Sequence, residues 1–215
     1  MSQLRSQSAD ATKGRVLRAA RTLFATRGID KVPIAGIAKR AGVSVPTVYA
    51  LYKSKEGILR ALIESSLFGQ RFQEAIGKLK GVTDAVKLIE LTPSVARAIY
   101  EGESSEMGLI RGASAFSAAL RKMESELEKL RFSMQKERVE LLFAQGKQRK
   151  GLPIEEARRI LWMYTSRDVY RLLVHEGGWT PDRYEQWLSE TLVYALIDPS
   201  SSKHKSVSPG RPNPA

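Results

Sequence analysis

The stretch of residues 37–59, IAKRAGVSVPTVYALYKSKEGIL, constrains the fold of this chain more than any other. Gly42 has the conformational freedom that a tight turn between two helices requires. Ser44 is suited to cap the helix that follows, and Pro46 fits the first turn of that helix, where a missing N–H costs little. Ser54 is suited to cap the next helix. The stretch therefore predicts three helices joined by two short turns.

The same stretch has the residue spacing of a helix-turn-helix. The small residue Ala38 lies where two helices would touch, Gly42 follows four residues later, and the apolar Val48 follows six residues after that. Three more apolar residues complete the expected small core: Ile37, Val43 and Leu51. In this geometry a small domain can place its second helix in the major groove of DNA.

Basic residues are concentrated around this segment. Residues 1–60 hold 12 Lys and Arg against 3 Asp and Glu, a net charge of +9, whereas the whole chain of 215 residues has +12. No acidic residue lies between Lys31 and Lys55. A basic N-terminal module joined to a nearly neutral body is typical of a protein that binds a polyanion, although a solvated basic surface would look similar.

The run GVSVPTVYALYKSKEGIL resembles the signature of tetracycline-repressor-like (TetR-family) regulators. The resemblance covers about residues 12–62 and includes the preceding helix, RVLRAARTLFATRGI. The residues in register are Ala41, Gly42, Val43, Ser44, Thr47, Tyr49, Lys55 and Glu56. Two positions depart from the family: Val32-Pro33 and Ala35-Gly36 replace its usual threonine cap and basic residue at the second helix.

The resemblance implies a DNA-binding site on the second helix of the motif. By resemblance, Thr47, Tyr49 and Lys55 contact phosphates, and Val45, Pro46 and Ala50 face the base edges. The other residues expected at this site are Lys39, Ser44 and Lys53. Three alternatives stay open: Tyr49 as a core aromatic, Thr47 as a hydroxyl at a helix start, and Lys53 as a solvated lysine.

The expected recognition helix lacks Arg, Asn and Gln, so bidentate hydrogen bonds to purines are not available from it. Val45, Pro46 and Ala50 would instead contact thymine methyl groups and sense DNA shape. Phosphate contacts would then supply most of the affinity.

The rest of the chain predicts an all-α protein of about nine helices. The expected divisions are a flexible arm at 1–11, a three-helix helix-turn-helix domain at 12–60, a helical regulatory and dimerisation domain at 61–197, and a disordered tail at 198–215. Helices are expected at about 12–27, 33–41, 45–52, 55–79, 84–101, 113–148, 153–175 and 181–197, and the loop-like sequence at 102–112 has room for a further short helix. Pro93 is expected to kink or split its helix.

The last helix is apolar over a broad front and resembles the dimerisation helix of the family. The residues assigned to the dimer interface are Tyr184, Leu188, Thr191, Leu192 and Ala195. A monomer core would explain this pattern equally well. A two-fold dimer would place two recognition helices about one DNA turn apart, roughly 34–36 Å, and predicts a palindromic operator.

Aromatic, methionine and arginine residues gather in the middle helices, where the family encloses a small-molecule pocket. The candidate effector residues are Arg97, Tyr100, Phe116, Met123, Trp162, Met163, Arg167 and Tyr170. An ordinary helical core would use the same residue types. The resemblance implies a homodimeric repressor released by a small molecule. The alternative is a DNA-bound protein without a ligand that recruits a protein partner through Trp179 and Trp187.

Other classes of function have little support in the sequence. There is no cysteine, no apolar run of the roughly 18 residues that span a membrane, and no signal peptide, so a soluble cytoplasmic protein is expected. The only histidines are His175 and His204, and no metal-site spacing or catalytic constellation is present. We therefore expect no enzyme activity, no metal and no cofactor.

Overall fold

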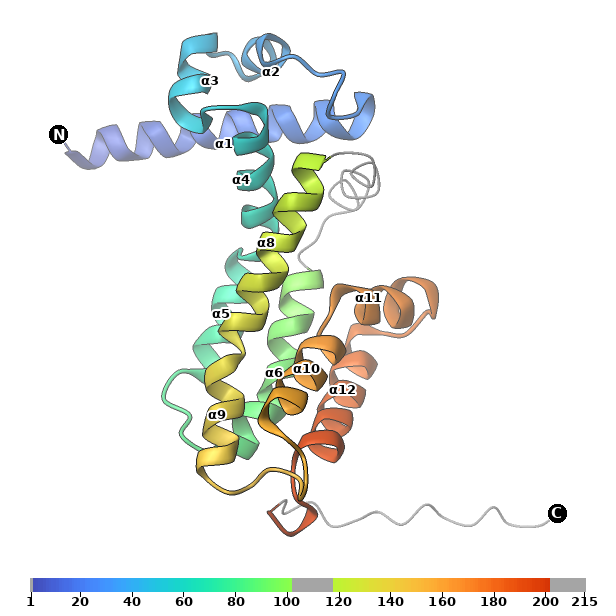
Figure 1. Cartoon of the computed structure of the whole chain (residues 1–215). Helices are drawn as coiled ribbons and strands as arrows, with labels where there is room; N and C mark the ends of the chain where they lie inside the picture. Colours follow the sequence, from blue (N-terminus) through green and yellow to red (C-terminus); the bar gives the residue numbers. More distant parts are fainter. Residues whose placement is uncertain (1, 102–117, 202–215) are drawn as a thin grey trace.

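A computed structural model describes residues 2–101 and 118–201, and this part of the chain is helical (Figure 1). The first four helices are α1 (Ser2–Arg27), α2 (Ile34–Ala41), α3 (Val45–Tyr52) and α4 (Lys55–Leu67). The body contains α5 (Gln70–Leu79), α6 (Ala85–Glu101), α8 (Ala118–Met134), α9 (Lys136–Ala144), α10 (Ile154–Tyr164), α11 (Arg167–Tyr170), a π-helix (Arg171–Glu176), α12 (Pro181–Leu196) and a short 3-10 helix (Pro199–Ser201). The all-α prediction, with an N-terminal helix-turn-helix and a helical body, is confirmed.

The molecule has two main apolar cores. The first lies between α1, α2, α3 and α4, and it includes one residue of the body, Met123 of α8. The second lies between α6, α9, α10 and α12. Helix α8 runs alongside α4 towards the N-terminal helices (Figure 1). Ile99 of α6 packs against both cores and so connects them.

Several predicted boundaries are wrong. The first helix was expected from about residue 12, but α1 begins at Ser2. The expected helix at 55–79 is divided at Gly69, which starts α5 in an extended conformation. The expected helix at 113–148 is divided at Gln135 and ends before Gln145. The helix expected at 153–175 is interrupted at Thr165, because Ser166 adopts an extended conformation and caps α11. The predictions for 102–112 and for most of the tail lie outside the described residues.

Pro93 lies inside α6, where it removes one backbone donor without ending the helix. Neighbouring hydroxyls of this helix bond to backbone carbonyls: Thr92 Oγ1 donates to the Leu88 oxygen at 2.8 Å, and Ser94 Oγ to the Leu91 oxygen at 2.8 Å. Ser189 of α12 donates to the Glu90 oxygen at 3.2 Å and so links α12 to this irregular stretch. No helix among the described residues is long and apolar enough to cross a membrane.

Candidate nucleic-acid interface and body cavity

The turn between α2 and α3 is fixed by local hydrogen bonds. Gly42 ends α2 in the left-handed conformation with φ of 64°, which a glycine adopts without strain. The Val43 N–H donates to the Ala38 oxygen at 3.1 Å. Ser44 Oγ accepts the N–H of Thr47 at 3.2 Å and caps α3. The sequence-based assignment of this turn and its cap is confirmed.

The turn between α3 and α4 leaves room only for a glycine at position 57. Ser54 Oγ caps α4 by accepting the Gly57 N–H at 3.1 Å. A Cβ atom on Gly57 would lie 1.9 Å from the Tyr52 oxygen, far inside van der Waals contact. Lys53, just before the cap, has a positive φ of 65°. The close backbone approach sets the direction in which α4 leaves the motif.

One face of α3 is open to solvent. Pro46, Tyr49 and Ala50 are exposed, with Tyr49 at 48%, whereas Val48 on the opposite side is 1% exposed. This excludes Tyr49 as a core aromatic. Val45, expected at the base edges, is half-buried and packs against the N-terminal core. The face therefore consists of Pro46, Tyr49 and Ala50 more than of Val45.

The three lysines near this face differ in whether their side chains are exposed or bonded within the domain. Lys39 and Lys53 are exposed. Lys55 instead donates its ammonium group to two backbone oxygens of the α1–α2 loop, those of Ile29 at 2.9 Å and Asp30 at 3.3 Å. Lys55 therefore ties the start of α4 to this loop, a role that the sequence did not indicate.

Tyr52 makes a further long-range contact that the sequence did not reveal. Its hydroxyl donates to the Lys13 oxygen of α1 at 3.1 Å, and burial raises the pKa of this tyrosine. The contact fixes the end of α3 against α1. Only the packing of helices 39 residues apart in the sequence brings these groups together.

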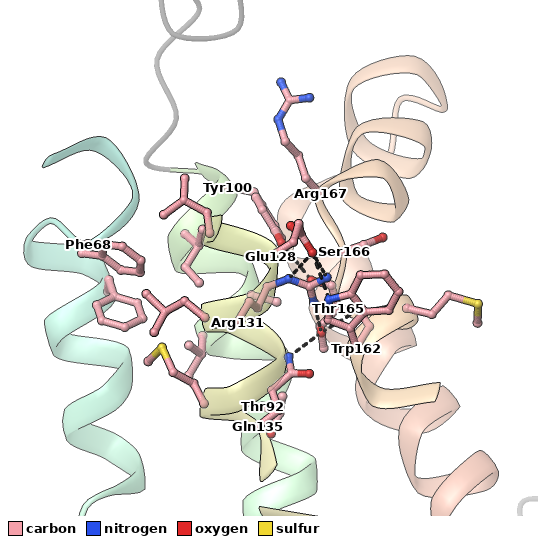
Figure 2. A pocket seen from close by; sticks show the side chains of 18 of the residues that line it. Phe68, Thr92, Tyr100, Glu128, Arg131, Gln135, Trp162, Thr165, Ser166 and Arg167 are labelled. Atoms are coloured by element: carbon pink, nitrogen blue, oxygen red, sulfur yellow. Dashed lines mark hydrogen bonds and ion pairs between the residues drawn. The ribbon is translucent and has the colours of Figure 1, made fainter. Parts of the chain in front are cut away.

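The body contains a cavity of about 550 Å³ between α4–α5, α6, α8–α9 and α10–α11. Its size lies within the range of small-molecule sites. Apolar lining residues are Phe68, Phe72, Ile76, Val95, Ala96, Ile99, Leu127, Leu130 and Met134. Figure 2 shows Phe68 on one side of the cavity, opposite a group of hydrogen-bonded polar side chains.

The polar wall is a closed network centred on Arg131. Its guanidinium donates to Glu128 Oε2 at 2.6 and 3.1 Å, to the Trp162 oxygen at 2.6 Å, and to Thr165 Oγ1 at 3.0 Å. The Trp162 indole donates to the same Glu128 oxygen at 2.9 Å. Gln135 Nε2 donates to Thr165 Oγ1 at 2.8 Å (Figure 2). The network fastens α8 to α10.

The predicted effector residues divide into two groups. Tyr100, Trp162, Met163 and Arg167 line the cavity, and Figure 2 shows Arg167 pointing away from the polar network. Arg97, Met123 and Tyr170 are not among the lining residues, whereas Phe116 lies outside the described residues.

The described candidate effector residues that do not line the cavity have structural roles instead. Burial would lower the pKa of Arg97, but hydrogen bonds to Glu185, Asp182 and Glu101 raise it, so this arginine links α6 to α12. Met123 is 3% exposed within the N-terminal core, and Tyr170 is 2% exposed within the body core.

The interface prediction for α12 is largely wrong. Tyr184, Leu188 and Leu192 are 0% exposed in the single chain, because they face α6 and α10 within its own core. They cannot also contact a second subunit. Thr191 and Ala195 are half-buried, and Tyr194 beside them is 75% exposed. The side of α12 that is free for a partner therefore lies next to the predicted stripe.

Several lining residues were missed in the sequence. Glu124, Glu126 and Glu128 look like a solvated helix face, but Glu124 and Glu128 line the cavity and Glu126 forms an ion pair with Arg60 of α4. Phe68 and Phe72 are four residues apart and their rings pack edge to face at 5.0 Å, a spacing that could have indicated an aromatic wall.

The helix-turn-helix, with an exposed α3 face flanked by Lys39 and Lys53, has the features of a DNA-binding domain. Residues 16–62 match the model of bacterial regulatory proteins of the tetR family, so the N-terminal part of the chain is similar to that family. Uncharacterized HTH-type transcriptional regulators of Mycobacterium tuberculosis and Mycobacterium bovis are 43% identical to the chain over 56 residues, 26% of the chain and 30% of each relative.

Solved structures share the fold over most of the chain. NalD, the secondary repressor of the MexAB-OprM multidrug efflux pump in Pseudomonas aeruginosa, has a TM-score of 0.65 at 18% identity, covering 89% of this chain and 98% of NalD. SmeT in complex with triclosan has 0.65 at 17%, covering 94% and 100%. FadR from Bacillus subtilis in complex with stearoyl-CoA has 0.63 at 21%, covering 83% and 96%.

Proposed function

We propose that the chain is a homodimeric transcriptional repressor that binds palindromic operator DNA and is released by a small molecule held in the body cavity. The observation that carries the proposal is the exposed α3 face of Pro46, Tyr49 and Ala50 beside Lys39 and Lys53. NalD, a repressor with the same fold, supports the sign of regulation. Such a protein would act on DNA in the cytoplasm.

On this proposal, α3 enters the major groove with an almost apolar face. Pro46 and Ala50 contact thymine methyl groups, and the Tyr49 hydroxyl contacts a phosphate. The ammonium groups of Lys39 and Lys53 attract the phosphates. Lys55 acts indirectly, because its ammonium group is bonded to loop carbonyls and so holds the start of α4 in position. Sequence preference then depends more on methyl contacts and DNA shape than on hydrogen bonds to bases.

The homodimer would form through α10 and α12. Met163 is 49% and Tyr194 75% exposed, and half-buried Thr191 and Ala195 continue the same surface of α12. Exposed large apolar side chains of this kind favour a subunit contact. Sedimentation velocity should show a dimer for the full chain, whereas a monomer at micromolar concentration would remove this part of the proposal.

The cavity favours a ligand-controlled protein over a DNA-bound recruiter. A protein that recruits a partner through Trp179 and Trp187 would need both side chains exposed, but both are half-buried. Their ring centroids are 5.7 Å apart, and the Arg183 guanidinium lies 4.1 Å from the centre of the Trp179 ring. Helix α8 would carry the signal, since Leu127 lines the cavity and also packs against the N-terminal core. A ligand acts by preferring one arrangement of α4 and α8 to the other.

Selection from a random DNA pool tests the proposal. The full chain should enrich a two-fold symmetric sequence whose half-sites lie about one turn, roughly 34–36 Å, apart. Ala50→Gln should change the preferred base at one symmetric pair of positions, because glutamine can bond to adenine. Failure of the folded protein to enrich any sequence would overturn the proposal. An unchanged preference in Ala50→Gln would exclude α3 as the recognition helix.

A further inference from the structure

The cations that line the body cavity differ in how far the protein itself satisfies them. Arg131 has its Nε and both terminal nitrogens in hydrogen bonds to Glu128, Trp162 and Thr165. Arg131 is therefore a fixed part of the wall. These bonds use most of its N–H donors, so it can bind a ligand fully only if the contact between α8 and α10 breaks.

Arg138 of α9 lines the same cavity and is almost unused. Its single hydrogen bond to described residues runs to Thr92 Oγ1 at 3.4 Å, which is long for an N–H···O bond. No carboxylate among the described residues forms an ion pair with it. A guanidinium has five N–H donors, so most of those of Arg138 lack a protein acceptor. Burial lowers the pKa of Arg138, and the charge of the neighbouring Glu137 offsets only part of this effect.

A second polar group near Arg138 is also incomplete. Gln135 lines the cavity three residues earlier, is 8% exposed, and has an Oε1 atom without a hydrogen-bond partner among the described residues. Buried polar groups normally have partners, and each exception calls for an explanation. Together Gln135 and Arg138 form an unsatisfied polar end of a cavity whose other walls carry Phe68, Phe72 and Val95.

We propose that the cavity binds an amphipathic monoanion, an apolar molecule with one carboxylate, and that Arg138 holds the carboxylate. A planar guanidinium can bind both oxygens of a carboxylate at once. A multiply charged anion fits less well, because Glu124, Glu128 and Asp168 also line the cavity. This inference deepens the proposed function by giving the chemical class of the ligand, and it rests on the ligand site proposed there.

Three probes with the same alkyl chain test the charge: dodecanoate, 1-dodecanol and dodecyltrimethylammonium, each below its micelle concentration. Binding to the full chain is followed by calorimetry and by the fluorescence of Trp162, which lines the cavity. Dodecanoate should bind at least about tenfold more tightly than the alcohol, since hydrogen bonds to charged groups have this strength. The cationic probe should bind most weakly.

Variants assign the effect to one side chain. Arg138→Met should remove the preference for dodecanoate over dodecanol, whereas Arg138→Lys should keep part of it. Arg159→Met is the matched control, because Arg159 is an exposed residue of α10 outside the cavity lining, and it should behave like the parent protein. Circular dichroism of each variant verifies folding, and the Lys variant keeps the test valid if the Met variant unfolds.

The inference is overturned if no probe binds, if the alcohol or the cation binds as tightly as dodecanoate, or if the preference survives in folded Arg138→Met. The proposed function fails separately. If dodecanoate binds through Arg138 but leaves the affinity for selected DNA unchanged, the ligand class stands and the release mechanism falls. If the chain selects no DNA, the repressor proposal falls whatever the cavity binds.

Discussion

The turns of the N-terminal domain and one end of the body cavity differ in how far the protein satisfies their polar groups. In the N-terminal domain the turns are closed by nearby partners: Ser44 with Thr47, Ser54 with Gly57, and Lys55 with the loop before α2. In the body, Arg138 and Gln135 remain incomplete around a cavity of about 550 Å³. The first region presents a preformed surface, whereas the second keeps space and bonding capacity that a ligand can use.

The largest effect in this comparison is expected from Gly57→Ala. The new Cβ would lie 1.9 Å from the Tyr52 oxygen, so the turn between α3 and α4 must open. We expect a loss of more than about 3 kcal/mol in the free energy of unfolding and a loss of DNA binding. Gly77→Ala in α5 is the control, since nothing lies within 4 Å of its Cβ position, and it should be neutral or stabilising by up to about 1 kcal/mol. Urea unfolding measures both, and equal effects would contradict the description of the turn.

Leu192→Ala and Tyr194→Ala separate the core side of α12 from its free side. Leu192 is 0% and Tyr194 75% exposed. Leu192→Ala should lower the free energy of unfolding by about 2–5 kcal/mol because it leaves a cavity in the core. Tyr194→Ala should change the stability of the monomer by less than about 0.5 kcal/mol but weaken the dimer. Sedimentation velocity and urea unfolding distinguish the two results, and a dimer unaffected by Tyr194→Ala would place the interface elsewhere.

Lys55→Met and Lys39→Met compare a lysine tied to the fold with an exposed one. Lys55→Met removes two hydrogen bonds from a charged donor and should cost about 1.5–3 kcal/mol of stability. Lys39→Met should leave stability unchanged and lower the salt dependence of DNA binding by about one phosphate contact. DNA affinity measured from low to moderate salt tests this. A salt slope reduced by about one in Lys55→Met would show that Lys55 is also a phosphate contact.

The smallest effect concerns the buried hydroxyl of Tyr184. It has no hydrogen-bond partner among the described residues, although its ring packs against Tyr170 at 4.8 Å, and burial raises its pKa strongly. Tyr184→Phe should therefore raise the free energy of unfolding by about 1 kcal/mol, and the melting temperature by roughly 2–4 °C. A lower melting temperature in calorimetry would mean that the hydroxyl is hydrogen-bonded within the body core.

The difference between the two regions also explains what the sequence could predict. Gly42, Ser44 and Ser54 act on neighbours within five residues, so local sequence was sufficient to assign the turns and caps of the N-terminal domain. The role of Lys55 was missed because its partners, Ile29 and Asp30, lie 26 and 25 residues away.

In the body, similar residues have different roles because packing decides between them. Arg97 and Arg131 each pair with a glutamate about one turn away in their own helix, yet Arg97 also pairs with α12 and Arg131 forms the cavity wall with α10. Likewise, the apolar stripe of α12 was read correctly as a buried face, but the sequence could not tell whether α6 or a second subunit covers it. The cavity arises from the crossing of several helices, so the sequence indicated only part of its lining, including Tyr100 and Trp162.

Footprinting of the full chain on the DNA that flanks its own gene tests the central claim most directly, that the exposed α3 face binds a specific duplex. We predict two protected patches on one face of the DNA, about one helical turn apart, which disappear in a folded Tyr49→Ala, Ala50→Glu double variant. Protection without a defined site, equally strong in that variant, would contradict the account.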